Sequence, residues 1–115
     1  MSIEQPPDVS FACEDGIFVK QMYLKDAGTL VPQHSHEYDH ISMLAVGSVR
    51  VWADDRLMGD YVAPQPIVIR ARVKHTLLTL EPGTTIYCIH NISRTGEIEI
   101  HAEHQLGDTP CRGAS

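Results

Sequence analysis

The sequence has no excess of basic residues and no long apolar run, and each shortage excludes a class of protein. Nine Lys and Arg stand against fifteen Asp and Glu, a net charge of −6. This balance argues against nucleic acid or an anionic membrane surface as the main partner. The longest purely apolar runs are only a few residues, so we expect no membrane-spanning segment.

Cysteine is scarce as well. The three cysteines, Cys13, Cys88 and Cys111, are widely spaced, odd in number and without a CxxC pair. They are poor material for a disulfide framework and indicate a reducing intracellular setting. The N-terminus also lacks the basic start and apolar core of a signal peptide. Together these features predict a cytoplasmic protein.

A helical period is missing too. No window holds apolar residues at a 3.6-residue period for three turns, whereas period-two and short β-branched runs recur between turn residues. We expect strands at residues 16–24, 40–46, 48–53, 66–71, 75–80, 84–91 and 96–104. Evenly spaced short strands predict an all-β sandwich or barrel. We expect one domain over residues 11–106, with tails at 1–10 and 107–115.

Histidines are concentrated in one short stretch. The chain has seven, and His34, His36 and His40 lie within seven residues of one another. All three share one parity, so an extended chain with at most one bulge points their imidazoles into one interior. A lone buried histidine is usually a core residue and an HxH pair is common on exposed strands. Three imidazoles on one face favour a metal site, because neutral imidazole is the commonest ligand of several transition metals.

The spacing around these histidines resembles the first motif of the cupin superfamily, G-x5-H-x-H-x3-4-E-x6-G. Here the pattern is Gly28-x5-His34-x-His36-x3-His40-x6-Gly47, and the one departure is a histidine where most cupins carry Glu. Every spacing matches.

The second cupin motif, G-x5-P-x-G-x2-H-x3-N, is eroded. His75 matches its histidine, whereas Pro64, Arg70, Arg72 and Thr79 replace its first Gly, its Pro, its second Gly and its Asn. The resemblance covers about residues 15–104, with some sixteen residues between the two motifs.

The resemblance implies a cupin-type jelly-roll β-barrel, a double-stranded β-helix, that holds one divalent transition metal. The ligands carried over by position are His34, His36, His40 and His75. Without a carboxylate ligand the ion keeps its full positive charge, which favours bound anions and lowers the pKa of bound water. Nitrogen ligation suits Fe, Mn, Ni, Cu or Zn, and the sequence does not choose among them.

Several further residues are candidates for roles near the metal. His90 shares parity with Ile86 and Cys88, and it is either a general base, a hydrogen-bond donor to a ligand, or a packed core histidine. Ser42, Leu44 and Val46 share parity with His40 and are expected to line the interior.

The remaining candidates each have a plainer structural alternative. Arg70 and Arg72 either bind a substrate carboxylate or are edge charges. Glu37 and Asp39 lie on the opposite parity and are candidates for orienting imidazoles from behind. Tyrosines and the single tryptophan are either pocket residues or packing residues: Tyr38, Tyr61, Tyr87 and Trp52.

Three functions compete. The favoured one is a mononuclear metal-dependent dioxygenase or other oxidoreductase that acts on a small diketone- or catechol-like substrate. The others are a metal-dependent lyase or isomerase, and a non-enzymatic structural or assembly module stabilised by its metal. Edge strands of such barrels usually pair, and the stretch 11–24 is a candidate partner strand. We therefore expect a homo-oligomer, most simply a dimer, or a subunit of a larger assembly.

Overall fold

The computed structural model describes residues 3–4, 8–32 and 35–92 and arranges most of them in strands. The strands are β1 (Ile3–Glu4), β2 (Asp8–Glu14), β3 (Ile17–Leu24), β4 (Thr29–Pro32), β5 (His40–Val46), β6 (Ser48–Ala53), β7 (Arg56–Val62), β8 (Gln65–Ile69), β9 (His75–Thr79) and β10 (Thr84–Asn91). This confirms the all-β expectation for the described part of the chain.

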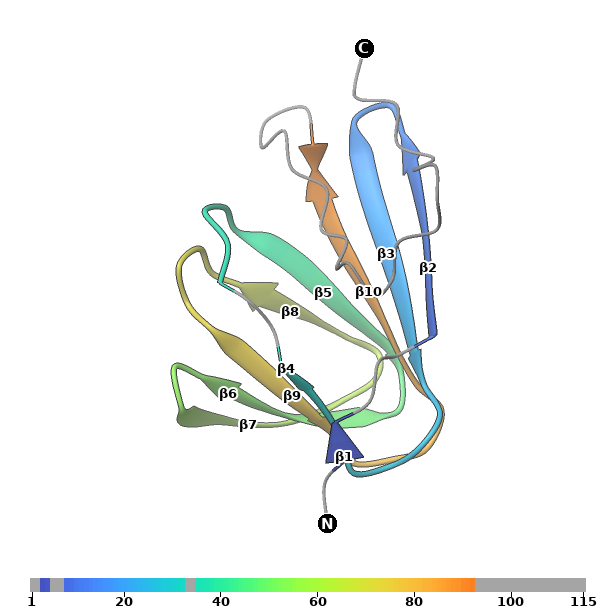
Figure 1. The fold of residues 1–115 in the computed structure, drawn as a ribbon, viewed down its shortest axis with the longest axis vertical. Coiled ribbons are helices and arrows are strands. Elements are labelled where there is room, and N and C mark those ends of the chain that lie inside the picture. The colour runs from blue at the N-terminus through green and yellow to red at the C-terminus, as the bar shows by residue number, and fades with distance from the viewer. Residues whose placement is uncertain (1–2, 5–7, 33–34, 93–115) are drawn as a thin grey trace.

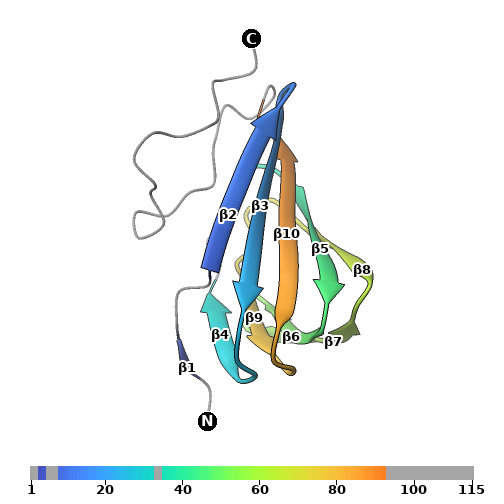
Figure 2. The ribbon, with the colours of Figure 1, turned by 90° about the vertical axis from the view of Figure 1, so that its right-hand side faces the viewer.

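The strands form two five-stranded sheets. One has the order β1-β4-β9-β6-β7 and the other β2-β3-β10-β5-β8. Figure 1 shows the two sheets converging at the end where β3 turns into β4 and β9 turns into β10, and Figure 2 shows these two turns side by side. Gly28 N donates to Thr79 O at 2.8 Å and Gly83 N donates to Lys25 O at 3.1 Å, which joins the turns directly.

Two tight hairpins use residues in the left-handed region. β2 and β3 are joined through Asp15 and Gly16, with φ of 51° and 81°, and β6 and β7 through Asp54 and Asp55, with φ of 49° and 68°. Two-residue loops with positive φ at both positions match the twist of the flanking strands, and Asp and Gly tolerate that conformation best.

The hydrophobic core lies between the sheets and follows the alternation of the strands. On β9, for example, His75, Leu77 and Thr79 are buried while Thr76 and Leu78 are half-buried. Eleven buried residues form the main cluster: Met22, Leu24, Val31, Leu44, Val49, Val51, Ile67, Ile69, Leu77, Ile86 and Cys88.

Strands with clear apolar alternation were predicted well, and edge strands were not. β5, β6 and β10 have the expected bounds, and β3, β8 and β9 differ by at most two residues at an end. Edge strand β7 was missed because its side chains are exposed or half-buried throughout, which leaves no apolar period in its sequence. β2 and the short β1 and β4 were missed as well.

The expected tail at residues 1–10 contains strand structure. β1 pairs in parallel with β4, and β2 begins at Asp8 and pairs with β3, so the sheets start before residue 11. Backbone pairing of this kind leaves little trace in a short polar sequence. The expected strand 96–104 and tail 107–115 lie outside the described residues.

The interior position predicted for Val46 is wrong. Ser42 and Leu44 are fully buried as expected, but Val46 is 53% exposed. Thr85 pairs with Val46 while Ile86 pairs with Leu44, so Ala45 is an extra residue on β5. A β-bulge of this kind breaks the period of two and turns the following side chain to the other face.

The cysteines also differ from expectation. Cys13, on β2, is disulfide-bonded, whereas Cys88 is buried and takes part in no disulfide. The odd number of cysteines and their wide spacing in the sequence did not exclude a disulfide. Disulfide pairing depends on the proximity of two cysteines in the fold and not on their spacing along the chain.

In the part of the chain that the structure describes, no helix has the length and apolar character needed to span a membrane.

Candidate functional site

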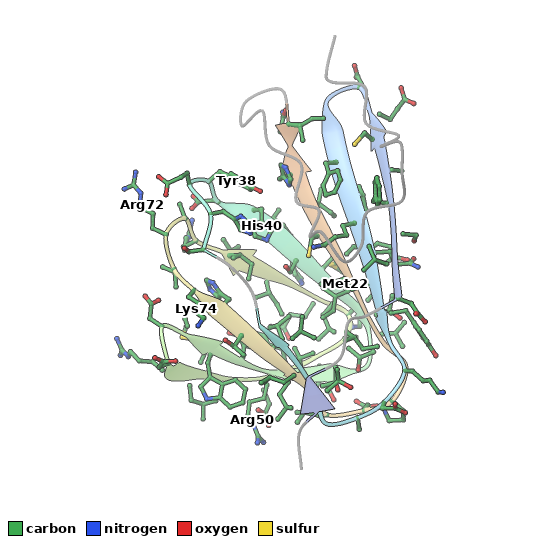
Figure 3. All side chains as sticks on the ribbon, viewed as in Figure 1. Met22, Tyr38, His40, Arg50, Arg72 and Lys74 are labelled. Atoms are coloured by element: carbon green, nitrogen blue, oxygen red, sulfur yellow. The ribbon has the colours of Figure 1, made fainter. Side chains whose placement is uncertain are left out.

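A cluster of imidazole and aromatic rings lies between the sheets, at the end away from the two converging turns. The ring centroids of His36 and His40 are 5.4 Å apart and the rings meet edge to face. Tyr38 stacks on His36 at 5.1 Å and lies 6.0 Å from His40. Figure 3 shows Tyr38 and His40 near this end, with Met22 closer to the converging end.

His90 joins the cluster from β10. Its ring centroid is 4.7 Å from that of Tyr38 and 5.1 Å from that of Phe18. His90 is 6% exposed and its face of β10 includes Ile86 and Cys88, both fully buried. The inward orientation that sequence parity predicts for His90 is therefore confirmed.

The loop before β5 alternates between inward and outward side chains. His36 and Tyr38 contact the cluster, whereas the side chains of Glu37 and Asp39 are 73% and 57% exposed. His40 then opens β5 with only 4% of its surface exposed. The parity that the sequence suggested for this stretch is confirmed from His36 to His40.

A second loop, residues 70–74, holds the histidine loop in place. Arg72 N donates to His36 O at 2.6 Å, and Ala71 N donates to Asp39 Oδ1 at 2.7 Å. Arg72 Nε lies 3.3 Å from Glu37 Oε1, and Arg70 Nη1 lies 3.5 Å from Asp39 Oδ2. We call these contacts the loop clamp.

The loop clamp bears on two pairs of residues for which the sequence left alternatives open. The side chains of Arg70 and Arg72 are 70% and 77% exposed, and Figure 3 shows Arg72 pointing away from the molecule. They are outward charges, as the alternative of edge charges expects, and binding of a substrate carboxylate stays a prediction. Glu37 and Asp39 contact this second loop, so the suggested role of orienting imidazoles from behind has no support in their contacts.

His75 faces the interior from the opposite sheet. It begins β9, is 6% exposed, and its Nδ1 lies 3.1 Å from Val73 O. A carbonyl oxygen only accepts hydrogen bonds, so Nδ1–H is the donor. In the neutral ring this places the lone pair on Nε2. Metal-binding histidines are commonly held in this way, with the second ring nitrogen bonded to a carbonyl.

The donor set fits a divalent transition metal. His36 Nε2 and both ring nitrogens of His40 are buried. Two imidazoles that bind one ion at about 2.1 Å have ring centroids about 5 Å apart, and the separation of 5.4 Å is compatible with this. Nitrogen donors of this kind suit Fe, Mn, Ni, Cu or Zn.

The full ligand set remains a prediction. His34 lies outside the described residues. Within residues 3–4, 8–32 and 35–92, no group of three or more His, Cys, Asp or Glu side chains is arranged to hold a metal ion. The structure therefore brings His36 and His40 together and turns His75 toward the same interior, and it does not test the set of four.

Two interior residues, Tyr38 and Lys20, have contacts or burial that the sequence analysis did not anticipate. Tyr38 contacts His36, His40 and His90, so it is the central ring of the cluster. Lys20 is only 2% exposed on β3, and the sequence analysis did not single it out. The sequence did contain an indication that Lys20 is buried, because Lys20 shares parity with Phe18 and Met22 on a strand whose even positions are buried.

Comparisons with known proteins identify the fold but no sequence family. No family model and no curated protein matches the sequence. Solved structures do match. A cupin superfamily protein from Desulfitobacterium hafniense is 15% identical, with a TM-score of 0.63 over 79% of this chain and 82% of that one.

Further structural neighbours agree. KdgF from a Halomonas species is 18% identical, with a TM-score of 0.63 over 77% of this chain and 81% of that one. A cupin from Methanocaldococcus jannaschii, described as a double-stranded β-helix, is 9% identical, with a TM-score of 0.59 over 79% and 86%. The chain therefore has the fold of these proteins, a double-stranded β-helix of the cupin type, with buried histidines inside.

Proposed function

We propose that the protein binds one divalent transition metal through His34, His36, His40 and His75. The observation that supports this most directly is the pairing of His36 and His40, whose rings lie 5.4 Å apart with buried nitrogens. The inward face and the Nδ1 hydrogen bond of His75 give further support. The ion would be drawn from Fe, Mn, Ni, Cu and Zn.

We further propose that this site serves a dioxygenase or other oxidoreductase, with a small diketone- or catechol-like substrate. When bound, the metal would supply Lewis-acid and redox chemistry. The chain's own residues would shape the site: the loop clamp positions His36, and Tyr38 packs beside the ligands between His36 and His90. The imidazole of His90, which contacts Tyr38, is the candidate for holding or moving a proton.

Metal content tests the binding proposal. In protein purified without added metal, we expect elemental analysis to find close to one ion per chain. His36→Ala and His40→Ala should each lose most of it, and His40→Glu should retain it, because a carboxylate is also a metal ligand. A chelator should lower the melting temperature of the native protein but not of the alanine variants.

His101→Ala is the matched control, because it removes a histidine that the proposal does not use. It should leave the metal content unchanged. Equal metal content in His36→Ala, His40→Ala and the native protein would contradict the proposed ligands.

Measurements of oxygen uptake distinguish the proposed oxidoreductase from the two alternative functions, a structural module and a lyase or isomerase. Anaerobic loading with Fe(II), followed by oxygen and a panel of diketones and catechols, should give substrate-dependent oxygen consumption. Tight binding of a redox-inert ion without turnover would favour the structural module, and turnover without oxygen would favour a lyase or isomerase.

We also propose that the protein forms a homodimer. An apolar row crosses the outer face of the second sheet, in which neighbouring strands pair Ala12 with Val19, Val19 with Ile89, Ile89 with Ile41, and Ile41 with Val68. Ile41 and Val68 are 45% and 49% exposed. An exposed apolar row of this kind suits an isologous contact with a second copy.

A further inference from the structure

The second loop, residues 70–74, is the connection that crosses from one sheet to the other. It leads from β8 to β9, which belong to different sheets. Just before the loop, Ile69 pairs with His40, and just after it His75 begins β9. Figure 1 shows this connection beside the loop that enters β5. The conformation of residues 70–74 therefore helps to set the distance between His40 and His75.

An aspartate of the histidine loop holds the start of the second loop. Asp39 Oδ1 accepts a hydrogen bond from Ala71 N at 2.7 Å. Asp39 directly precedes His40 in the chain, so this bond joins the backbone of one proposed ligand to the loop that leads to another. The ion pair of Asp39 with Arg70 is longer, at 3.5 Å, and exposed, so it contributes less.

A second aspartate holds the end of the same loop. Asp54, in the turn between β6 and β7, accepts a hydrogen bond at Oδ1 from Lys74 N at 3.0 Å, and Asp54 N donates to Lys74 O at 2.8 Å. Lys74 directly precedes His75, which pairs with Ala53 at the last position of the ladder between β6 and β9. The end of a ladder opens more easily than its middle, so these two bonds limit the movement of His75.

The two aspartates share one mode of action. Both are exposed, and each carboxylate accepts a hydrogen bond from a backbone N–H of the second loop. Such a bond is charge-assisted and stronger than the same bond to a neutral acceptor. Asp39 and Asp54 therefore act on the backbone that carries the histidines, from outside the barrel.

We propose that Asp39 and Asp54 are positioning residues for the metal site. By fixing the two ends of the second loop, they hold His75 where it can bind the same ion as His36 and His40. This inference rests on the proposed function and adds to it two residues that are not ligands. Removal of groups that orient metal ligands typically weakens metal binding by about 10–100-fold.

Zn(II) binding to the full chain, after a chelator has removed any metal, tests the inference. In calorimetric titrations, Asp39→Ala and Asp54→Gly should each bind Zn(II) about tenfold more weakly than the native protein. Glycine is chosen at the second position because the φ of Asp54 is 49°, which glycine adopts without strain. Asp39→Asn should recover most of the affinity, because its amide oxygen still accepts a hydrogen bond from Ala71 N.

The neighbouring acids of the same two loops provide matched controls. Glu37→Ala removes an exposed ion pair with Arg72, and Asp55→Gly removes a turn carboxylate at a φ of 68°. Each should change the Zn(II) affinity less than about twofold. The visible absorption of Co(II)-loaded protein is a second measurement, which a loss of stability alone would not change. It should differ from that of the native protein in Asp39→Ala and Asp54→Gly and not in the controls.

Three results would overturn the inference: native Zn(II) affinity in Asp39→Ala and Asp54→Gly, an equal loss in the two controls, or no recovery in Asp39→Asn. If one of the two main variants does not fold, the other decides. His36→Ala keeps the two proposals apart. Zn(II) binding that is lost in His36→Ala and unchanged in the aspartate variants would refute the positioning role alone, whereas a native protein that binds no Zn(II) would refute the metal site as well.

Discussion

At the scale of single residues, two positions of the first motif are glycines because of the backbone they must adopt. Gly28 and Gly47 have φ of 80° and 90°, in a region that other residues rarely enter. Gly47 is also crowded, since a Cβ built there would come within 2.9 Å of Thr84 Cα. The Gly at this place in the motif therefore has a steric reason independent of any metal.

Gly47→Ala should be markedly destabilising. The left-handed backbone costs a residue with a Cβ about 1–2 kcal/mol, and the clash with Thr84 adds about 1–3 kcal/mol. Gly83→Ala is the control, because Gly83 has φ of 76° but its Cβ would meet only Tyr23 Oη, at 3.9 Å. Urea denaturation should show a larger loss for Gly47→Ala; equal losses would contradict the steric argument.

Thr79 shows how a departure from the family motif is accommodated. Its hydroxyl accepts a hydrogen bond from Thr29 N at 2.9 Å and donates one to Asp26 O at 2.8 Å. Thr79 is 1% exposed, so these bonds satisfy a buried polar group and hold the turn between β3 and β4 against β9. The replacement of the motif's Asn thus has a structural use in this chain.

At the scale of elements, the loop clamp joins the start of β5 to the segment that precedes β9. His40 and His75 are the first residues of these two strands, on different sheets. The backbone donors of Ala71 and Arg72 are the firmer part of the clamp, because exposed ion pairs such as Arg72 with Glu37 contribute little. The segment before β9 is therefore fixed against the histidine loop mainly by backbone donors, and its side chains contribute less.

A cross-strand ion pair between β6 and β7 gives a pH-dependent prediction. Arg50 Nε and Asp60 Oδ1 are 2.7 Å apart, and the hydrogen bond from Arg50 lowers the pKa of Asp60. The pair therefore stabilises the fold above the ordinary pKa of Asp, and this contribution is lost as pH falls through the lowered value.

Asp60→Asn should accordingly lower the melting temperature slightly at neutral pH and not at all in strong acid. Thermal unfolding across pH, at low and high salt, checks this, and salt should reduce the difference because both groups are exposed. Asp55→Asn, in the neighbouring hairpin turn, is a control for loss of a surface carboxylate. A difference between Asp60→Asn and the native protein that persists at low pH would contradict the pairing.

At the scale of the whole molecule, the proposed dimer depends on the outer face of the second sheet. β3 has neighbours on both sides, so of the stretch 11–24 only β2 lies at a sheet edge. The apolar row that contains Ile41 and Val68 crosses all five strands of this sheet, from Ala12 on β2 to Val68 on β8. This is why the proposed dimer uses the face of the sheet.

Light scattering tests the dimer. The native protein should have twice the chain mass of 12.8 kDa, and Ile41→Lys with Val68→Lys should give a folded monomer. Met58→Lys is the control, because Met58 is 56% exposed on β7 of the other sheet. A native protein of single-chain mass, or a double variant that remains dimeric, would refute this surface.

The sequence by itself determined the fold class and most central strands. Alternate side chains of β5, β6, β9 and β10 are buried, so apolar residues recur every two positions in these segments. It also indicated that His36 and His40 share a face, since parity along an extended chain is a local property. Only the tertiary structure decided which rings meet across strands. The contacts of Tyr38 with His90, the burial of Lys20 beside Cys88, and the outward turn of Val46 depend on sheet register and on a bulge, and these are set by pairing between segments far apart in the chain.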